Sequence, residues 1–436
     1  MTMALQGRYY CFTIVVRLNQ IEVAPGAYLG FDESMENTPE NLKKFREAIA
    51  KAIPEARITI AFSHSALADE SGNYRELRRL AREYAQKYGD DITYVAGGYF
   101  IGAYVPRERA KAHIDDALAL LEKMMGKGYN PRSVIGGFLP AAILEHLAAR
   151  GIHAAQGNIF SQYYVDNQDG EGSICYPYYP SKQHFCKPAQ NAEDFIDCVN
   201  FDGWTVDFIC ASYCGCTPEG YNSRMGCGPI ETLRPYGEKT GTEIMLDTVD
   251  QMLGENYYRN GNFGLAASIW ELCLMQKNGS HAMDIDGDTV YGFFSALKER
   301  YPDAEVVTIG ELGESFRREN KDNSALDYRF VHKGTGKGGS LADVQITWYM
   351  NDVFRMALKK NLRTGEERVI DFTDYTKNYS EPADSDYLKG ESNRSWSLLG
   401  DINQKGLRPQ DTPVPFGNLT EKQKTLFFGK IKDENN

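Results

Sequence analysis

The sequence contains no long apolar run. No stretch of its 436 residues approaches the roughly 18 consecutive apolar residues that indicate a membrane-spanning helix. The best N-terminal run, CFTIVV at 11–16, is too short for a secretory signal, and Arg17 ends it before any small-residue cleavage site. We therefore interpret it as a buried strand and expect a cytoplasmic protein without a membrane partner.

Basic residues are scarce relative to acidic ones. The chain has 48 Lys and Arg against 60 Asp and Glu, which gives a net charge of −12. Because nucleic acids and anionic membranes are bound through basic surfaces, this balance argues against both partners but leaves neutral ligands open. The contents of 42% hydrophobic and 25% charged residues are typical of a globular protein, and the length suggests two domains or one large domain with an appendage.

Complete metal-binding motifs are missing as well. No two of the seven histidines are four residues apart, so the chain has no helical His-x3-His pair. The nine cysteines are an odd number, and the cluster Cys210, Cys214, Cys216 and Cys227 fits the paired C-x2–4-C spacing of zinc sites poorly. We expect no cofactor and keep a divalent metal as an alternative.

Alternating strands and helices dominate the first three quarters of the chain. Strands are predicted at the short apolar runs 9–16, 57–62, 91–100, 133–138, 152–157, 204–211, 266–275 and 305–312. The intervening helices carry apolar residues at spacings of three and four; one begins at Thr38-Pro39 and another ends at Gly89. At least seven such units predict a (β/α)7-type barrel of mostly parallel strands, with a doubly wound sheet as the alternative. In either fold the functional face lies at the carboxyl ends of the strands.

A second region begins near residue 320. Strand-like runs at 328–332, 344–350, 353–358 and 368–375 are joined by Gly-rich or polar turns, which predicts a small β-rich unit. The chain beyond about 376 is polar and contains prolines, as expected for a segment that wraps the surface. We therefore predict a barrel domain over 1–320 and a β-rich domain with an extended tail over 321–436.

One long insertion breaks the alternation after the fifth strand. It contains GSICYPYYPSKQHFCKPAQ (172–190), which is rich in aromatic residues although no apolar period runs through it. A long irregular insertion is uncommon unless it is functional, and this one emerges at the functional face. We expect Tyr176, Tyr178, Tyr179 and His184 to form one wall of a pocket, where rings stack on sugar faces. The alternative is that the loop packs down as a lid on the core.

Acidic side chains mark several strand ends. Glu22 follows the first strand, while Asp207 and Glu271 lie within apolar runs, where a carboxylate is costly unless it is paired or functional. Two such acids around one pocket are what glycoside hydrolysis requires. The alternative is that they form buried structural ion pairs, with Arg17 or Arg224 as partners.

Further side chains are expected at the same face. His64 follows the strand at 57–62 and is a candidate proton donor, although a loop-capping role is an equal alternative. The expected substrate-binding set also includes neutral amides, aromatic rings and one carboxylate. Its members are Asn19, Glu22, Gln156, Asn158, Trp270, Tyr163 and Tyr164.

Two stretches resemble a known superfamily. RSVIGGFLPAAILEHLAARGIHAAQGNIFSQYYVDN (132–167) is similar to the later part of the polysaccharide deacetylase barrel, and ALKERYPDAEVVTIGEL (296–312) resembles how those barrels close. This is the glycoside hydrolase/deacetylase β/α-barrel superfamily, which includes polysaccharide deacetylases and the family 57 and family 38 glycosidases. RLNQIEV, DFIDCVNFDGWTVDF, NSRMGCGPIETL and the 172–190 stretch are more closely similar to a bacterial family of unknown function within it.

The resemblance implies a carbohydrate-active enzyme, but the chain departs from the metal-dependent members. Deacetylases place an Asp pair after the first strand and a His-x3-His after the second, and these hold a divalent metal. Here the corresponding positions carry RLNQIE (17–22) and the lone His64. Family 57-like enzymes instead use two carboxylates late in the barrel, and Asp207 and Glu271 lie at comparable strand positions.

The sequence therefore favours a metal-independent glycoside hydrolase. Glu271 and Asp207 would form the acid/base pair, and His64 would assist them. A first alternative is a catalytically inactive barrel that binds a saccharide or an assembly partner. A second is a divalent-metal-dependent deacetylase-like hydrolase whose ligands include His64, Glu22 and Asp32.

Overall fold

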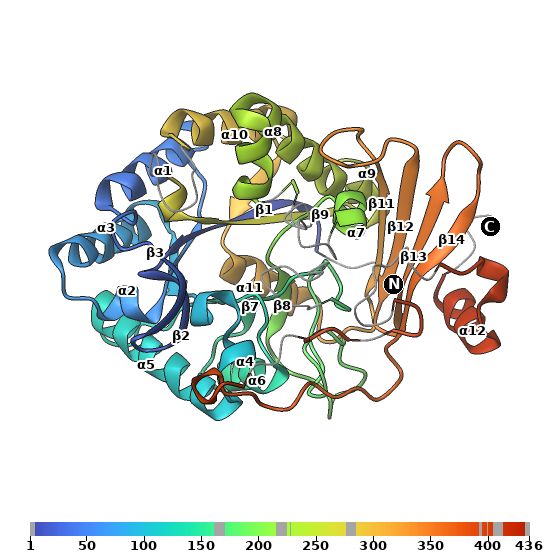
Figure 1. Ribbon diagram of the computed structural model, residues 1–436, viewed down its shortest axis with the longest axis horizontal. Helices are drawn as coiled ribbons and strands as arrows, with labels where there is room; N and C mark the ends of the chain where they lie inside the picture. The colour runs from blue at the N-terminus through green and yellow to red at the C-terminus, as the bar shows by residue number, and fades with distance from the viewer. Residues whose placement is uncertain are drawn as a thin grey trace.

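The computed structural model describes residues 5–160, 171–214, 225–226, 228–275, 285–391, 395–398, 400–403 and 413–431. Helices surround parallel strands in one part of the molecule, and a four-stranded antiparallel sheet lies at the other end (Figure 1). The predicted parallel α/β architecture and the C-terminal antiparallel sheet are therefore confirmed. Within the described ranges no helix is both long and apolar enough to cross a membrane.

Strand β1 (Gly7–Val16) is the centre of the larger parallel sheet. It pairs with β9 (Phe263–Glu271) along one edge. Along the other edge it pairs first with β10 (Ala304–Val307) and then with β4 (Thr59–Phe62), which in turn pairs with β5 (Asp91–Tyr94). The last seven residues of β1 are all buried, which explains why its sequence is a continuous apolar run.

A second parallel sheet consists of β6 (Val134–Ile135), β7 (Ala154–Asn158) and β8 (Val199–Asp202). A single bridge between Val95 and Ile135 links it to the chain after β5. At its other edge the Thr205 N–H donates to the Ala267 carbonyl of β9 at 2.9 Å. The two sheets thus approach each other at both edges without a continuous ladder, and closure into a (β/α)7-type barrel stays a prediction.

Helix ends follow the capping residues of the sequence. α1 (Pro39–Ala52) begins after Thr38, whose side chain accepts from the Asn41 N–H, and α3 (Gly72–Tyr88) ends at Gly89, where φ is 79°. α10 (Gly287–Arg300) begins after Asp286, which accepts from the Thr289 N–H. Further helices are α2 (His64–Ala68), α4 (Ile101–Tyr104), α5 (Arg107–Met125), α6 (Ala141–Ala149), α7 (Phe208–Cys214), α8 (Pro229–Leu253), α9 (Glu255–Arg259), α11 (Ile309–Glu319) and α12 (Glu421–Lys430).

Several segments differ from the predicted pattern. Residues 309–312, expected as the end of the last strand, form the first turn of α11, because the Thr308 side chain caps this helix by accepting from the Glu311 N–H. Residues 96–99 and 272–275, expected within strands, form short 3-10 turns.

The strand expected at 204–211 is absent: residues 204–207 are irregular and 208–211 begin α7, because the Asp207 carboxylate accepts from the Cys210 N–H as a helix cap. β8 lies inside the expected irregular insertion, where its short VNFD sequence gives little apolar signal. After β1 the chain turns back as the hairpin of β2 (Asn19–Ala24) and β3 (Ala27–Asp32), which the sequence pattern did not predict.

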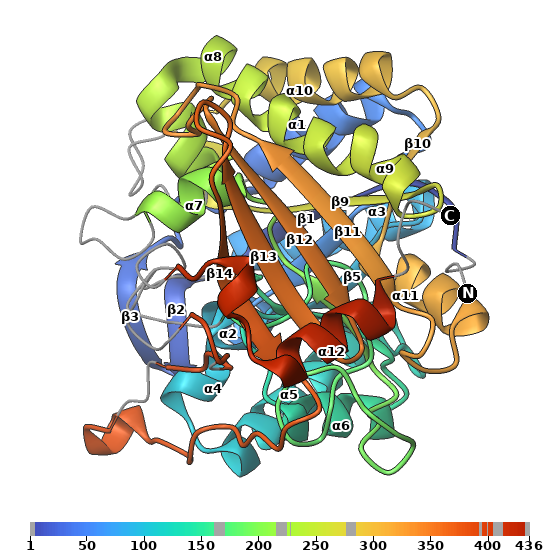
Figure 2. The same ribbon diagram turned by 90° about the vertical axis from the view of Figure 1, so that its right-hand side faces the viewer.

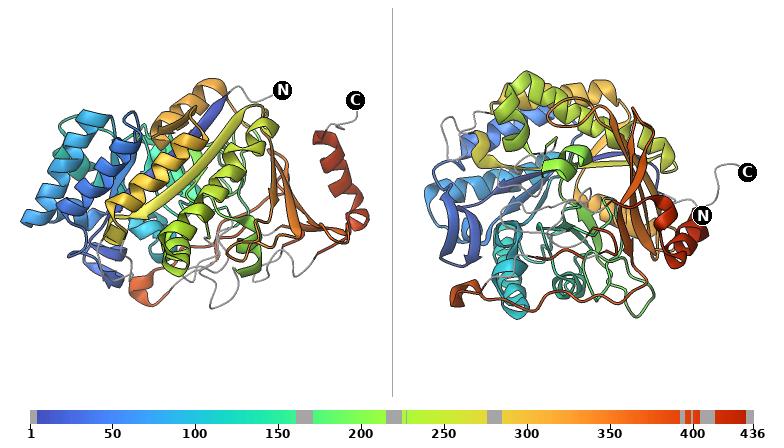
Figure 3. Two further views of the ribbon diagram at one scale, coloured as in Figure 1. Left: turned by 90° about the horizontal axis from the view of Figure 1, so that it is seen from above. Right: turned by 45° about the vertical axis from the view of Figure 1, so that its right-hand side comes forward.

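The C-terminal sheet has two differently covered faces. Its strands, in order, are β11 (Asp327–Lys333), β12 (Val344–Asn351), β13 (Phe354–Asn361) and β14 (Glu367–Asp374). One face joins the main core through Tyr328, Phe330, Ile346, Trp348 and Met350. The other face packs Phe354, Met356 and Phe372 against Phe427 of α12, which lies outside the sheet (Figures 2 and 3). The sheet and the parallel part therefore share one core, and a domain boundary at residue 320 stays a prediction.

Candidate active site

Glu271 ends β9 beside the end of β1. Its register partner on β1 is Val15, and two residues later Arg17 directs its guanidinium to the same place. Arg17 forms two hydrogen bonds of 2.7 Å with Glu33, and its Nη1 lies 3.8 Å from Glu271 Oε1. The side chains of Arg17 and Glu33 are 3% and 0% exposed, whereas that of Glu271 is 12% exposed. Glu271 is therefore the member of this group that a ligand can reach.

Tyr99 bonds the same oxygen of the Glu271 carboxylate that Arg17 approaches. Its hydroxyl donates to Glu271 Oε1 at 3.0 Å. Burial, followed by the charge of Glu271, raises the pKa of Tyr99 well above its ordinary value, so the hydroxyl keeps its proton and acts as the donor. The residue has a left-handed backbone with φ of 88°, directly after Gly97 and Gly98 at 61° and 64°.

The turn that carries Tyr99 is closely packed. A Cβ on Gly98 would lie 2.6 Å from the backbone oxygen of Gln20 in β2, so only glycine fits there. Left-handed backbone at a non-glycine residue costs on the order of 1–3 kcal/mol and is kept where the surroundings impose it, often at functional sites. The β2–β3 hairpin therefore helps to fix the position of the Tyr99 hydroxyl against Glu271.

Trp204 completes the described part of this group. Its ring meets that of Tyr99 edge to face at a centroid distance of 5.2 Å, and its indole N–H donates to the Ile269 carbonyl of β9 at 3.2 Å. The segment after β8 thus brings an aromatic ring next to the Tyr99–Glu271 pair. Both rings are buried, Tyr99 at 5% and Trp204 at 2% exposed, so they hold the partly exposed Glu271 carboxylate in place from within the fold.

Asp207 does not share partners with Glu271. Its Oδ1 lies 3.0 Å from Nε2 of His332 on β11 and accepts from the Cys210 N–H at 2.8 Å. Burial would raise the pKa of Asp207, but His332 and these hydrogen bonds outweigh it and hold the pKa below its ordinary value. This differs from the expected acid/base pair and matches the alternative of a buried structural pair, with His332 in place of an arginine.

The aromatic residues of the 172–190 loop are packed into the interior. The Tyr176 ring stacks on Tyr328 of β11 at 4.6 Å, and the hydroxyls of Tyr178 and Tyr179 donate to the carbonyls of Phe185 and Asn320. These three rings are at most 2% exposed. The loop therefore packs as a lid between the parallel strands and the C-terminal sheet, which corrects the expected open pocket wall.

His184 is also enclosed. Its side chain stacks on the ring of Phe185 at 5.2 Å, and its Nδ1 accepts from the Cys186 N–H at 3.1 Å. Burial, with the charge of Arg107 nearby, lowers the pKa of His184 to about 3, so the imidazole is neutral at physiological pH. A neutral, internally bonded His184 does not form part of an open pocket wall either.

Four other expected binding residues point to internal partners. Trp270 is 1% exposed and packs against Phe12, Phe45 and Phe293. Each of the three amides forms one internal hydrogen bond. These bonds join Gln156 Oε1 to the Thr13 hydroxyl at 2.9 Å, Asn158 Nδ2 to Ser173 Oγ at 3.0 Å, and Asn19 Oδ1 to the Ile21 N–H at 3.3 Å. All four side chains are buried, so contact with a ligand stays a prediction for them.

The residues considered as metal ligands do not converge. His64 Nε2 bonds Asp116 of α5 at 2.6 Å, Glu22 accepts from the Ser63 hydroxyl at 2.5 Å and from the Ser65 N–H, and Asp32 accepts from the Ser34 N–H at 2.9 Å. In the part of the chain that the structure describes, no group of three His, Cys, Asp or Glu residues is placed to hold a metal ion. Tyr163, Tyr164, Cys216, Arg224 and Cys227 lie outside the described residues, as does the side chain of Cys214.

Asp202 is a site candidate that the sequence pattern missed. It ends β8, and its Oδ1 accepts from the N–H groups of Phe160 at 3.1 Å and Trp204 at 3.4 Å. Burial raises the pKa of Asp202 to about 8, so at neutral pH it carries a proton. A local signal existed, because FDGW places an acid and a glycine at a strand end, directly before the tryptophan that meets Tyr99.

Family models cover nearly the whole chain. The model of DUF3863, a domain of unknown function with a solved structure, matches residues 2–350. That of DUF3864, which has the same description, matches residues 355–433. The border between them falls at the turn from β12 to β13. No curated protein matches the sequence.

Solved structures include one that is similar over the full length. It is a protein from Parabacteroides distasonis, provisionally assigned as a glycoside hydrolase/deacetylase, with 39% identity, a TM-score of 0.90 and 98% of both chains covered. The GH57 branching enzyme of Thermococcus kodakaraensis has 13% identity, a TM-score of 0.44 and 71% of both chains covered. The GH57-type branching enzyme of Pyrococcus horikoshii has 13% identity and a TM-score of 0.41, with 72% of this chain and 71% of that chain covered.

Proposed function

The chain belongs to the DUF3863 family, and from the side chains around Glu271 we propose that it acts as a glycoside hydrolase. The predicted resemblance to glycoside hydrolase/deacetylase proteins is confirmed by the full-length relative. The observation that carries the proposal is a partly exposed carboxylate at a strand end, bonded by Tyr99 and 3.8 Å from Arg17. Hydrolysis of a glycosidic bond needs such a carboxylate as base or nucleophile.

Glu271 is suited to the base or nucleophile role. The Tyr99 hydroxyl and the Arg17 guanidinium contact its Oε1, and Oε2 bonds no side chain that the structure describes. Trp204 is only 2% exposed, so its ring supports Tyr99 from within the fold and limits the movement of the pair. Positioned groups of this kind contribute roughly 10²–10⁴-fold to a rate.

A second carboxyl group is required as the acid. Asp207, the expected partner, pairs with His332 and caps α7. Its carboxylate therefore has a structural role, and protonating it would weaken both contacts. Asp202 has better support as the proton donor, because burial raises its pKa to about 8 and it bonds the backbone of Trp204. We therefore propose Glu271 and Asp202 as the pair and retain Asp207 as the comparison.

Substitutions at the three acids test this assignment. Activity would be measured on a panel of 4-nitrophenyl glycosides and mixed oligosaccharides, and folding by circular dichroism. Glu271→Gln should lower kcat by about 1,000-fold and Asp202→Asn by about 100-fold with the fold retained. Asp207→Asn should lower the thermal unfolding temperature and leave kcat largely unchanged. Full activity of Glu271→Gln would overturn the proposal.

A saccharide-binding protein without catalysis is the second candidate. It is favoured by the 3.8 Å contact between Arg17 and Glu271, since a carboxylate engaged with a cation is less available as a catalytic group. An inactive wild-type protein that still binds oligosaccharides in isothermal titration would support it. Loss of that binding in Glu271→Ala would locate the saccharide at the same group.

The metal-dependent deacetylase alternative has less support. Glu22, His64 and Asp32 each bond separate partners rather than a common centre. Release of acetate from acetylated oligosaccharides, abolished by EDTA and restored by a divalent metal, would favour this alternative over the glycosidase.

A further inference from the structure

Helices α3 and α5 enclose a basic groove on the side of the molecule away from the C-terminal sheet (Figure 1). The groove has a volume of about 240 Å³, and Leu67, Leu120 and Met124 provide its apolar surface. Five cationic side chains and one carboxylate line it. They are Arg75, Arg78, Arg79, Arg82, Lys123 and Glu70. Such a surplus of cations is unexpected in a chain whose net charge is −12.

Three of the five cations already have carboxylate partners. Arg79 pairs with Glu76 and Glu83 along α3, while Arg75 and Lys123 both lie 3.9 Å from Glu70. Their charges are therefore partly compensated within the fold.

Arg78 and Arg82 have a different kind of partner. One nitrogen of Arg78 donates to the Ala66 carbonyl at 2.8 Å, and one of Arg82 donates to the Met124 carbonyl at 3.2 Å. Neither forms an ion pair with any residue that the structure describes. Burial lowers the pKa of Arg78 by more than the nearby carboxylates of Glu70 and Asp69 raise it, so these counter-charges compensate its lost hydration only in part.

The spacing of these two arginines points to a shared ligand. Residues four apart lie on one helix face, and like charges at that spacing repel each other. A guanidinium has five donors in a planar fork that matches an oxyanion, so each arginine keeps donors free after its carbonyl bond. We propose that the α3–α5 groove binds a compact oxyanion, a phosphate or sulfate group, between Arg78 and Arg82 with Lys123 opposite.

Calorimetric titration with inorganic anions tests this site. The full-length protein would be titrated with sodium phosphate and sodium sulfate, at an ionic strength held constant with sodium chloride. Saturable binding of at least one anion is expected for the wild type. Arg78→Gln/Arg82→Gln should weaken it at least tenfold, and Arg78→Lys/Arg82→Lys should retain part of it.

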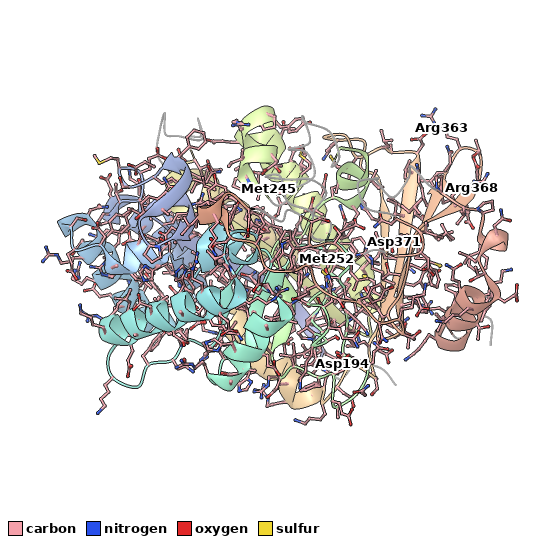
Figure 4. The ribbon with its side chains drawn as sticks, turned by 60° about the horizontal axis from the view of Figure 1, so that its bottom comes forward. Asp194, Met245, Met252, Arg363, Arg368 and Asp371 are labelled. Carbon is pink, nitrogen blue, oxygen red and sulfur yellow. The ribbon has the colours of Figure 1, made fainter. Side chains whose placement is uncertain are left out.

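A matched variant controls for net charge. Arg363→Gln/Arg368→Gln removes the same two charges from the far hairpin of the C-terminal sheet, where both arginines are labelled in Figure 4. This variant should bind as the wild type does. If Arg78→Gln/Arg82→Gln fails to fold, Arg82→Gln alone serves, because its carbonyl partner lies at a helix end. Equal binding by all variants, or no saturable binding of either anion, would overturn the site.

A second arm distinguishes a free anion from one carried on a sugar chain. Dextran sulfate and neutral dextran of equal length would be compared by affinity electrophoresis. Stronger binding of dextran sulfate than of inorganic sulfate, lost in Arg78→Gln/Arg82→Gln, identifies an esterified sugar. Binding of the inorganic anion without this gain identifies a free anion. The site is independent of the chemistry at Glu271, so an inactive protein leaves these outcomes unchanged.

Discussion

Tyr99 combines a left-handed backbone, a hydroxyl bonded to Glu271 and a ring packed edge to face on Trp204. These features support one another. The glycine turn sets the direction of the Tyr99 side chain, and the contact with Trp204 limits the movement of its ring. Strain of this kind is maintained only when the surrounding structure over-determines it. At the scale of single residues, Tyr99 therefore stands out as the group that positions Glu271.

Tyr99→Phe should lower kcat by about tenfold or more without loss of folding. The substitution removes one hydrogen bond to a charged group, which is worth roughly 1.5–3 kcal/mol, and keeps the ring. Steady-state kinetics and thermal unfolding would be measured together. Tyr179→Phe is the matched control, because its hydroxyl bonds the distant Asn320 carbonyl and its loss should affect stability alone. Unchanged kinetics in Tyr99→Phe would contradict the positioning role.

Two buried carboxyl groups should make stability depend on pH. Burial raises the pKa of Asp202 to about 8 and that of Asp91 to about 6, against about 3.9 in an unfolded chain. Between these values the folded protein binds more protons than the unfolded one, so stability falls as pH rises from about 4 to about 8. Urea unfolding at pH 5 and pH 8 would measure this fall.

Asp202→Asn should reduce that dependence. An amide is neutral at every pH in this range and can accept the same backbone N–H groups. The variant should therefore be more stable than the wild type at pH 8, on the order of a few kcal/mol, and similar to it at pH 4. An identical pH dependence in both proteins would show that Asp202 is ionised in the fold.

At the scale of elements, a buried ion-pair network ties the loop after β7 to the C-terminal sheet. Arg355 of β13 bonds Asp371 of β14 at 2.6 Å and Glu171 at 3.2 Å, and it donates to the Ser173 carbonyl at 2.9 Å. Asp371 is labelled on the sheet in Figure 4. Because Arg355 is fully buried, its charge is balanced by these partners rather than by water.

Removal of Arg355 should be strongly destabilising. Arg355→Met leaves two buried carboxylates without their cation, which typically costs 3–5 kcal/mol. Chemical denaturation would measure the change in the free energy of unfolding. Arg363→Met on the exposed hairpin, where the side chain is 80% exposed and pairs with Asp343, should cost less than about 1 kcal/mol. Similar effects at both positions would contradict a special role for the network.

At the scale of the whole molecule, one face of the C-terminal sheet forms part of the main core. Tyr176 of the inserted loop stacks on Tyr328 of β11, and Phe160 meets Trp348 of β12 at 4.9 Å. The sequence pattern places the aromatic loop at the functional face. In the structure its rings are instead buried between the parallel strands and the C-terminal sheet.

A chain truncated after residue 320 should not fold into a cooperative unit. The truncation removes Tyr328, Phe330 and Trp348 from the main core and exposes the loop that packs on them. A chain truncated after residue 418 loses Leu419 and α12 with Phe427 from the smaller core cluster and leaves the main core intact, so it should unfold cooperatively at a lower temperature. Thermal unfolding of the two chains, followed by circular dichroism, would test this expectation. Cooperative unfolding of the chain that ends at residue 320 would instead show that residues 1–320 form an independent domain.

The site was partly predictable because one of its signals is local. Glu271 was found from an acid inside an apolar strand, a pattern that is costly without a function or a partner. The signal for Tyr99 was present in its two preceding glycines, but a Gly-Gly pair in a turn does not show what the next side chain contacts. Asp207 had the same local pattern as Glu271, and its partner His332 is distant in sequence.

The sequence by itself determined most parallel strands and the helices α1, α3, α5, α6 and α10, but not α7, α11 or α12. Apolar periodicity, the Thr38 cap and the Gly89 stop are properties of neighbouring residues, and they act in any surroundings. Only the tertiary structure decided which polar groups at the strand ends stay partly exposed, as Glu271 does, and which bond another part of the chain. Such contacts join residues more than one hundred positions apart, as Tyr99 with Glu271 and Asp207 with His332, and no local pattern specifies which of them will form.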